Sequence, residues 1–187
     1  MAQAARQKRK EAVLMRITLE PASSKNAGLL GTIHSTCWQQ AYRDIMPVDY
    51  LAAASPEWWA ARYRKNLLDK TITRFLVRLN GNAIGLIGFA PSRDADADAA
   101  TGEIVAIYLL EQYHGNGYGR ELIDAMLGYF QRNGFRCVTL WALEANRSAC
   151  GFYEHCGFSL DGARKELEQG KMLPCVRYRR TFAGDSV

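Results

Sequence analysis

The chain has 187 residues, of which 48% are hydrophobic and 23% are charged, values typical of one globular domain with a sizeable core. No apolar run is long enough to span a membrane, and no apolar segment follows the basic start, which argues against a membrane partner and a secretory signal. The five cysteines are odd in number and include no C-x-x-C pair, so we expect reduced thiols in a cytoplasmic protein rather than disulfides or a metal site. The net charge of +5 suits an anionic cofactor, and no nucleic-acid motif accompanies it.

The sequence predicts one domain between two short tails, and the first half of that domain is rich in helices. We expect residues 1–11 to form a disordered basic tail, residues 12–183 to form the domain, and residues 184–187 to form a second tail. Apolar spacing predicts a strand, a helix, one or two further helices and two strands, in that order, at residues 12–20, 26–42, 50–66, 71–79 and 82–90. Ser55 is a plausible helix cap before Pro56 at a first helical position.

The second half of the chain predicts alternating strands and helices. Asn80-Gly81 is a strong hairpin signal between the two preceding strands. Residues 92–100 are acidic and rich in alanine, and we expect a mobile, solvated loop there. The pattern then predicts a strand, a helix, a strand, a helix and a closing hairpin at residues 103–110, 117–132, 136–142, 146–156 and 158–182. This order favours an α/β (α+β) fold, with a mixed central sheet and helices on both faces.

The most informative stretch is a glycine-rich segment, Gly115-Asn116-Gly117-Tyr118-Gly119-Arg120, between an apolar run and an amphipathic run. Alternate glycines let the backbone turn sharply, and the helix that follows offers unpaired N–H groups and the positive end of its dipole. The combination predicts a site for a phosphate or pyrophosphate. The simpler interpretation, that the glycines serve only the turn, stays open.

Two familiar glycine motifs do not fit this segment. A P-loop requires Lys-Ser or Lys-Thr after its last glycine, and here Arg120-Glu121 follows. The dinucleotide fingerprint is G-x-G-x-x-G, and here the spacing is G-x-G-x-G.

A second motif follows on the next predicted helix and comprises Asn146, Ala149, Phe152, Tyr153, Gly157 and Phe158. With Gly117 and Gly119 before it, the chain resembles the GCN5-related N-acetyltransferases, the GNAT superfamily, over residues 13–182. The order and spacing of the two motifs match this family. His114 stands where the family usually has Gln or Arg, which leaves the backbone cradle for the phosphates intact.

The resemblance implies a mixed, mostly antiparallel central sheet and the use of acetyl-CoA as co-substrate, without a metal. The expected reaction is acetyl transfer to a primary amine by direct attack in a ternary complex. The acceptor stays open among a protein N-terminus or lysine, an aminoglycoside or polyamine, and an aminoacyl-tRNA, as does a homodimeric assembly. A domain that binds acyl-CoA without turnover, as a sensor or interaction module, is the alternative.

The resemblance also assigns cofactor contacts to residues of this sequence. They are Ile107, Tyr108, Leu109, Gly115, Asn116, Gly117, Tyr118, Gly119, Arg120 and Asn146. The three residues of the strand would offer backbone groups to the pantetheine arm, and the N–H of Leu109 would also stabilise the oxyanion. Asn146 would bond the same arm, although it would serve equally as a helix N-cap.

Acetyl transfer requires that the amine loses a proton and that the leaving thiolate gains one. Tyr153 is the candidate acid, and a core tyrosine is its alternative. Glu103 is the candidate base, with Glu144 as second choice, and a solvent-facing residue at a strand end is the alternative for Glu103. Trp38 and Tyr42, with Glu144, are the candidate acceptor contacts, although aromatic residues in this region would also simply fill core.

Overall fold

The computed structural model describes residues 17–67 and 70–182. The strands are β1 (Ile17–Pro21), β2 (Thr73–Leu79), β3 (Asn82–Pro91), β4 (Thr101–Leu109), β5 (Cys137–Leu143), β6 (Ser159–Glu168) and β7 (Met172–Thr181). The helices are α2 (Ala27–Tyr42), α3 (Val48–Ala53), α4 (Pro56–Asn66), α5 (Tyr118–Arg132) and α6 (Arg147–His155), with a 3₁₀ turn at Glu111–Tyr113. The predicted tails, and residues 12–16 of the first predicted strand, lie outside the described residues.

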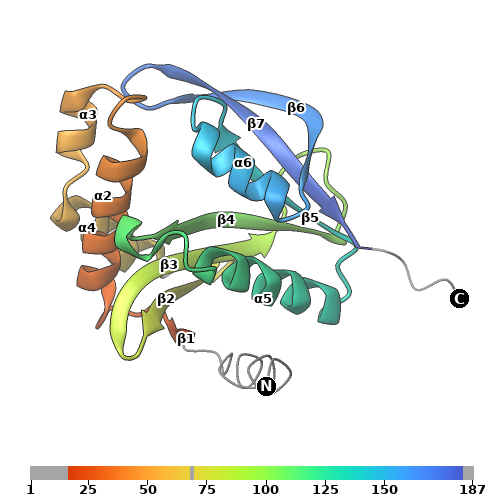
Figure 1. Ribbon diagram of the computed structural model, residues 1–187, viewed down its shortest axis with the longest axis horizontal. Coiled ribbons are helices and arrows are strands. Elements are labelled where there is room, and N and C mark those ends of the chain that lie inside the picture. The colour runs from red at the N-terminus through yellow and green to blue at the C-terminus, as the bar shows by residue number, and fades with distance from the viewer. Residues whose placement is uncertain (1–16, 68–69, 183–187) are drawn as a thin grey trace, which may run out of the picture.

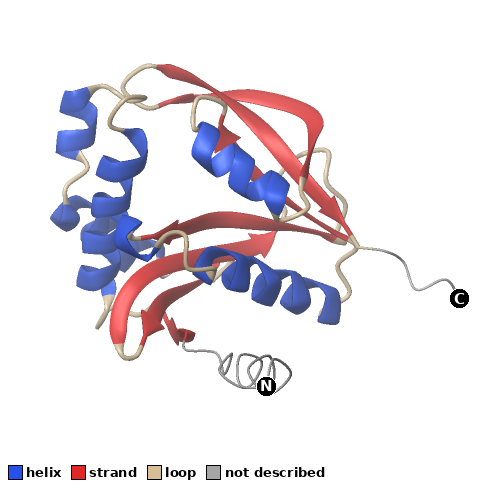
Figure 2. Cartoon of the chain, viewed as in Figure 1, coloured by secondary structure: helices blue, strands red, loops and turns tan. Residues whose placement is uncertain are grey.

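The strands form one sheet in the order β1-β2-β3-β4-β5-β7-β6. Neighbouring strands are antiparallel except for β4 and β5, which run parallel. Helices cover both faces of the sheet, as Figures 1 and 2 show. The predicted fold class, a mixed and mostly antiparallel sheet between helices, is therefore confirmed.

Each face of the sheet has its own apolar core. On one side, which we call the α5 face, α5 and α6 pack through buried residues such as Leu122, Phe130 and Cys150. On the other side, which we call the α2 face, Leu30 and Ile33 of α2 pack against the strands. Central strands such as β3 and β5 are therefore buried on both faces, because successive side chains point to opposite sides of the sheet.

Two local sequence signals have the predicted structural effect. Asn80 and Gly81 both adopt positive φ, 50° and 83°, as a tight turn between β2 and β3 requires. The hydroxyl of Ser55 accepts a hydrogen bond from the N–H of Trp58 at 3.2 Å, with Pro56 at the first helical position of α4. The segment 50–66 thus contains two helices.

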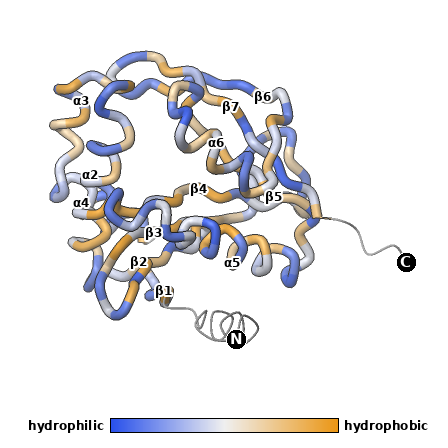
Figure 3. The backbone as a smooth tube through the Cα atoms, in the orientation of Figure 1, coloured by the Kyte–Doolittle hydropathy of each residue, from blue (hydrophilic) through white to orange (hydrophobic). Residues whose placement is uncertain are grey.

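The hairpin of β6 and β7 closes the sheet, and β6 is its edge strand. Figure 3 shows hydrophilic residues along much of β6, and charged side chains on an edge discourage pairing with another strand. No helix within residues 17–67 and 70–182 is long and apolar enough to cross a membrane.

Candidate active site

The candidate site lies where β4 and β5 separate. The two strands pair only over residues 101–103 of β4 and 137–139 of β5. β3 and β4 also lose register here, because Val105 is an extra residue between two paired positions of β4 and forms a bulge. Beyond residue 103 the facing edges of β4 and β5 are not paired with each other (Figure 1). Ile107, Tyr108 and Leu109, the predicted contacts of the pantetheine arm, lie on this separated part of β4.

The glycine segment connects β4 to the start of α5. Gly115 and Gly117 have φ of 74° and 84°, and a Cβ at either would meet no other atom within 4 Å, so their backbone conformation explains the need for glycine. Gly117 is the N-cap of α5 and offers no side chain, so the first N–H groups of the helix, starting at Tyr118, lack a side-chain partner. Gly119 has another role, because its Cβ would lie 3.1 Å from the ring of Phe152 on α6.

The side chains of the segment fold back onto the chain. Asn116 donates from Nδ2 to the carbonyl of His114 at 2.9 Å, and Nε2 of His114 lies 2.8 Å from the carbonyl of Leu109. Arg120 donates from Nε to both carboxylate oxygens of Asp124. These three side chains are therefore engaged within the chain, and the role of the backbone as a phosphate cradle stays a prediction.

Helix α6 positions the two motif residues on the α5 face. Asn146 is its N-cap and accepts a hydrogen bond from the N–H of Ala149 at 3.1 Å, so the structural alternative for Asn146 is fulfilled. The hydroxyl of Tyr153 has no hydrogen-bond partner within the described ranges of the chain. Burial, reinforced by the nearby Tyr108 phenol, raises the pKa of Tyr153 far above its usual range. Tyr153 therefore keeps its proton at neutral pH and is available as a donor.

Three aromatic side chains meet on the α2 face opposite Tyr153. Nε1 of Trp38 donates to the hydroxyl of Tyr108 at 3.0 Å, and the hydroxyls of Tyr108 and Tyr42 lie 3.3 Å apart. Burial and the phenols of Tyr108 and Tyr153 raise the pKa of Tyr42 well above its usual range. The two predicted acceptor contacts and a predicted cofactor contact are thus brought together, and they lie close enough to Tyr153 to influence each other's ionisation. The sequence did not show that the side chain of Tyr108 belongs to this group.

Glu103 lies on the α2 face, where β4 and β5 make their last pair, Glu103 with Thr139. Its carboxylate is buried and accepts three hydrogen bonds from Arg93: from the backbone N–H at 3.3 Å, from Nε at 2.9 Å and from the terminal nitrogen at 2.7 Å. A carboxylate has about four acceptor sites, so one remains for water or a substrate amine. The sequence did not indicate Arg93 as its partner.

Glu144 lies apart from this group. It pairs with Arg164 of β6, and that hydrogen bond lowers its pKa below the usual value. It also lines a cavity of about 240 Å³ between α6 and the hairpin of β6 and β7, with Arg147, Glu154 and Tyr178. The structure does not bring Glu144 together with Trp38 and Tyr42.

The acidic loop between β3 and β4 is attached to the sheet by a buried arginine. Arg177 of β7 donates to Asp94, Asp96 and Asp161 at 2.6–3.0 Å, and its side chain is only 7% exposed. Nε1 of Trp141 also donates to both carboxylate oxygens of Asp94 at 3.1 Å. The loop is still largely exposed, as expected, with the Asp96 side chain 64% exposed, but these bonds attach it to β5 and β7 at Asp94.

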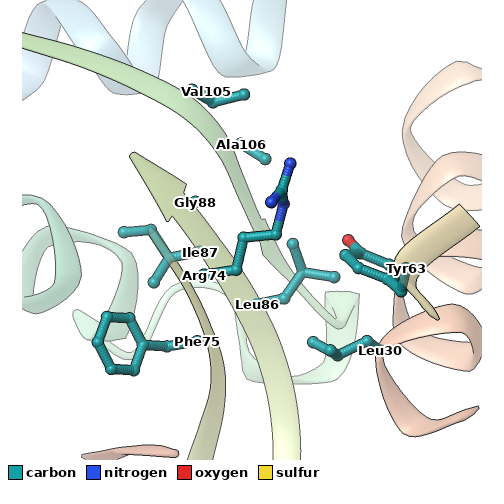
Figure 4. A pocket seen from close by; sticks show the side chains of 9 residues that line it. All are labelled: Leu30, Tyr63, Arg74, Phe75, Leu86, Ile87, Gly88, Val105 and Ala106. Carbon is teal, nitrogen blue, oxygen red and sulfur yellow. The ribbon is translucent and has the colours of Figure 1, made fainter. Parts of the chain in front are cut away.

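A separate cavity on the α2 face is too small for a substrate. Figure 4 shows it between Tyr63, Arg74 and strands β2 to β4, and its volume is about 20 Å³. This is room for about one water molecule. Next to it, His34 stacks on Trp59 with ring centroids 3.5 Å apart and lies 2.8 Å from the hydroxyl of Tyr63.

The chain is similar in sequence to one family of known proteins. A family model described as Acetyltransferase (GNAT) family matches residues 35–158. An uncharacterised N-acetyltransferase of Bacillus subtilis is 26% identical over 138 residues, which are 74% of this chain and 78% of that protein. A probable N-acetyltransferase of Mycobacterium tuberculosis is 28% identical over 155 residues, which are 80% of this chain and 85% of that protein.

Two solved structures have a similar fold. The PaiA N-acetyltransferase of Thermoplasma acidophilum, in complex with coenzyme A, superposes with a TM-score of 0.66 at 16% identity, over 89% of this chain and 99% of its own. A mutant of the spermidine N-acetyltransferase of Vibrio cholerae superposes with a TM-score of 0.64 at 22% identity, over 89% of this chain and 94% of its own.

Proposed function

This chain belongs to the acetyltransferase (GNAT) family and is an acetyl-CoA-dependent N-acetyltransferase, and we propose that it acetylates a primary amine by direct attack in a ternary complex. The observation that carries this proposal is the Tyr153 hydroxyl, which has no partner within the described ranges of the chain. The Tyr153 ring lies 6.0 Å from that of Tyr178 on β7, and its phenol is close enough to Tyr108 of β4 for Tyr108 to affect its pKa. A protonated phenol at this position suits a leaving thiolate.

Main-chain groups of the protein would bind two parts of acetyl-CoA, the pyrophosphate and the pantetheine arm. The pyrophosphate would lie on the N–H groups at the start of α5, where Gly117 leaves the helix without a side-chain cap. The pantetheine arm would then pair with the free edge of β4, in the manner of an added strand, and contact Asn146. This route delivers the thioester between Tyr153 on the α5 face and Tyr42 and Tyr108 on the α2 face.

The reaction would proceed by one attack and one cleavage. The amine nitrogen forms a bond to the thioester carbon, and the resulting oxyanion is stabilised by the N–H of Leu109. The carbon–sulfur bond then breaks, and Tyr153 supplies a proton to the thiolate. Glu103 accepts the proton that the amine loses, through the one acceptor site that Arg93 leaves.

Replacing Tyr153 by phenylalanine tests the function, because it removes only the donor. We expect kcat to fall by about 10- to 1,000-fold with little change in acetyl-CoA affinity. Coenzyme release with a panel of amines is the measurement, and Tyr129→Phe on the exposed side of α5 is the matched control. Coenzyme binding without release by the parent, for every amine, would favour the alternative of a non-catalytic acyl-CoA sensor.

The base role of Glu103 needs a pH profile. Glu103→Gln keeps the shape but cannot take a proton, so the variant should lose rate near neutral pH and recover part of it at high pH, where more amine is neutral. Superimposable profiles of kcat/KM for parent and variant would remove Glu103 from the base role.

The acceptor, the assembly and the location are narrower proposals. Similarity to spermidine N-acetyltransferases supports a small amine as acceptor, and one structure of that kind is dodecameric, which supports self-association here. Light scattering on the purified protein tests the assembly. The five free, buried cysteines support a reducing, cytoplasmic location, which cell fractionation tests.

A further inference from the structure

A lysine side chain covers an aromatic ring beside the candidate site. The Nζ atom of Lys165, on β6, lies 3.9 Å from the centroid of the Trp141 ring on β5. Elsewhere in residues 17–67 and 70–182, no hydrogen bond or ion pair holds this ammonium group. The indole face of Trp141, which we call the Trp141 face, is thus already bound to a primary ammonium group, the group that the proposed acceptor carries.

The Trp141 face belongs to the acceptor side of the sheet. The contact of Thr101 Oγ1 with Cys137 Sγ, 3.4 Å, shows that these side chains share one face of the sheet. It is the α2 face, because Gly102 between Thr101 and Glu103 points at Phe130 of α5. By alternation Glu103 and Thr139 share it as well, and Trp141 is the next residue of β5 on that face, just past the last pair with β4. An ammonium group on the Trp141 face is therefore on the same side of the sheet as the proposed base.

The charges around this ring include a second cation, because Cζ of Arg177 lies 5.6 Å from the ring centroid, but that guanidinium is paired with carboxylates. Nε1 of Trp141 donates to the Asp94 carboxylate, which polarises the indole and increases the negative charge of its face. The nearby carboxylates Asp94, Asp96 and Asp161 are bound to Arg177, so none of them ties down the Lys165 ammonium in a competing ion pair. The ring, rather than a carboxylate, is the group that an incoming ammonium would contact.

We propose that the Trp141 face binds the ammonium of the acceptor and that Lys165 occupies this face in the free protein as an internal competitor. This inference rests on the proposed function. The acceptor displaces Lys165, and its amine then passes a proton to Glu103 before it attacks the thioester.

Kinetics of Lys165→Met test the competition, because methionine keeps an unbranched side chain that is one atom shorter and removes the ammonium group. A cation–π contact of this kind is expected to change KM for the amine by about two- to fivefold. KM should fall by that factor in Lys165→Met and rise in Trp141→Leu, with the acetyl-CoA affinity unchanged. Lys171→Met, in the exposed turn beside β6, is the control for the loss of one positive charge.

The results that overturn the inference are distinct. An unchanged KM in Lys165→Met means a structural contact, and a raised KM means that Lys165 helps to bind the acceptor. An equal fall of KM in Lys171→Met means a general effect of charge. An acetyl group found on Lys165 in the intact mass of the parent, after incubation with acetyl-CoA, means that Lys165 is a substrate.

A second measurement does not depend on turnover. The ring current of Trp141 should shift the ε-methylene protons of Lys165 upfield in the NMR spectrum of the parent. Titration with phenethylamine should move these signals toward their ordinary position, whereas no movement contradicts the inference. If displacement occurs but no amine is acetylated, the proposed function fails while the binding of amines to the Trp141 face stands.

Discussion

Replacing Gly117 by alanine asks whether the glycine segment binds the cofactor through its backbone. Gly117 has φ of 84°, and a Cβ there would meet nothing within 4 Å, so the change introduces no collision inside the chain. Its cost is conformational, about 1 to 2 kcal/mol for a non-glycine residue in the left-handed region. For a chain of this size that corresponds to a fall in Tm of about 2 to 8 °C.

The same cost should appear in cofactor affinity if the observed conformation is the binding one. The variant loop relaxes to another conformation when free, and binding must restore the strained one, so Kd for acetyl-CoA rises by about 5- to 30-fold. Calorimetric titration of folded Gly117→Ala measures this rise.

Gly134 at the other end of α5 provides the matched control. It has φ of 81° and equally open surroundings, so Gly134→Ala should lose similar stability and keep the parent's affinity. Equal affinity in Gly117→Ala and the parent would refute the assignment of this loop to the pyrophosphate.

Three further predictions concern stability. Gly102→Ala places a Cβ 2.3 Å from the buried ring of Phe130, and the overpacking should cost roughly 1 to 3 kcal/mol in urea unfolding. Burial, and then the charge of a nearby arginine, lowers the pKa of His34 from 6.5 to about 3. As the pH falls, His34 is therefore protonated in the unfolded state before it is protonated in the folded state. The contribution of neutral His34 to the free energy of unfolding is complete above about pH 6.5 and is lost as the pH falls toward 3. The free energy of unfolding of His34→Gln should therefore change less than that of the parent between pH 7 and pH 4. Arg177→Gln leaves the Asp94 carboxylate and its neighbours without their cation, and should lower the free energy of unfolding by about 3 to 5 kcal/mol in the same assay.

Features that depend on a few neighbouring residues were predictable from the sequence. The Asn80-Gly81 turn, the Ser55 cap and the glycine segment before α5 each follow from backbone preferences that act within a few residues. The periodicity of apolar residues placed most elements correctly because it reports burial directly.

Contacts between distant segments were not predictable in this way. Arg93 and Glu103 are ten residues apart, and Arg177 meets Asp94 across 83 residues, so no local spacing marks these pairs. The role of Gly119 was also hidden, because a packing contact with Phe152 and a phosphate-binding turn both require a small residue. The extent of pairing between β4 and β5 depends on the bulge at Val105, which a run of apolar residues does not reveal.

The short pairing of β4 with β5 also has a mechanical consequence. The sheet consists of a four-strand part, β1 to β4, and a three-strand part, β5 to β7, and only residues 101–103 and 137–139 join them within the sheet. Such a narrow waist concentrates bending between the two parts, because few hydrogen bonds resist it. A ligand that hydrogen-bonds to the free edges would add the missing rungs and stiffen the whole sheet. Bound acetyl-CoA would then act as an additional strand that holds the two parts of the sheet together for as long as it is bound.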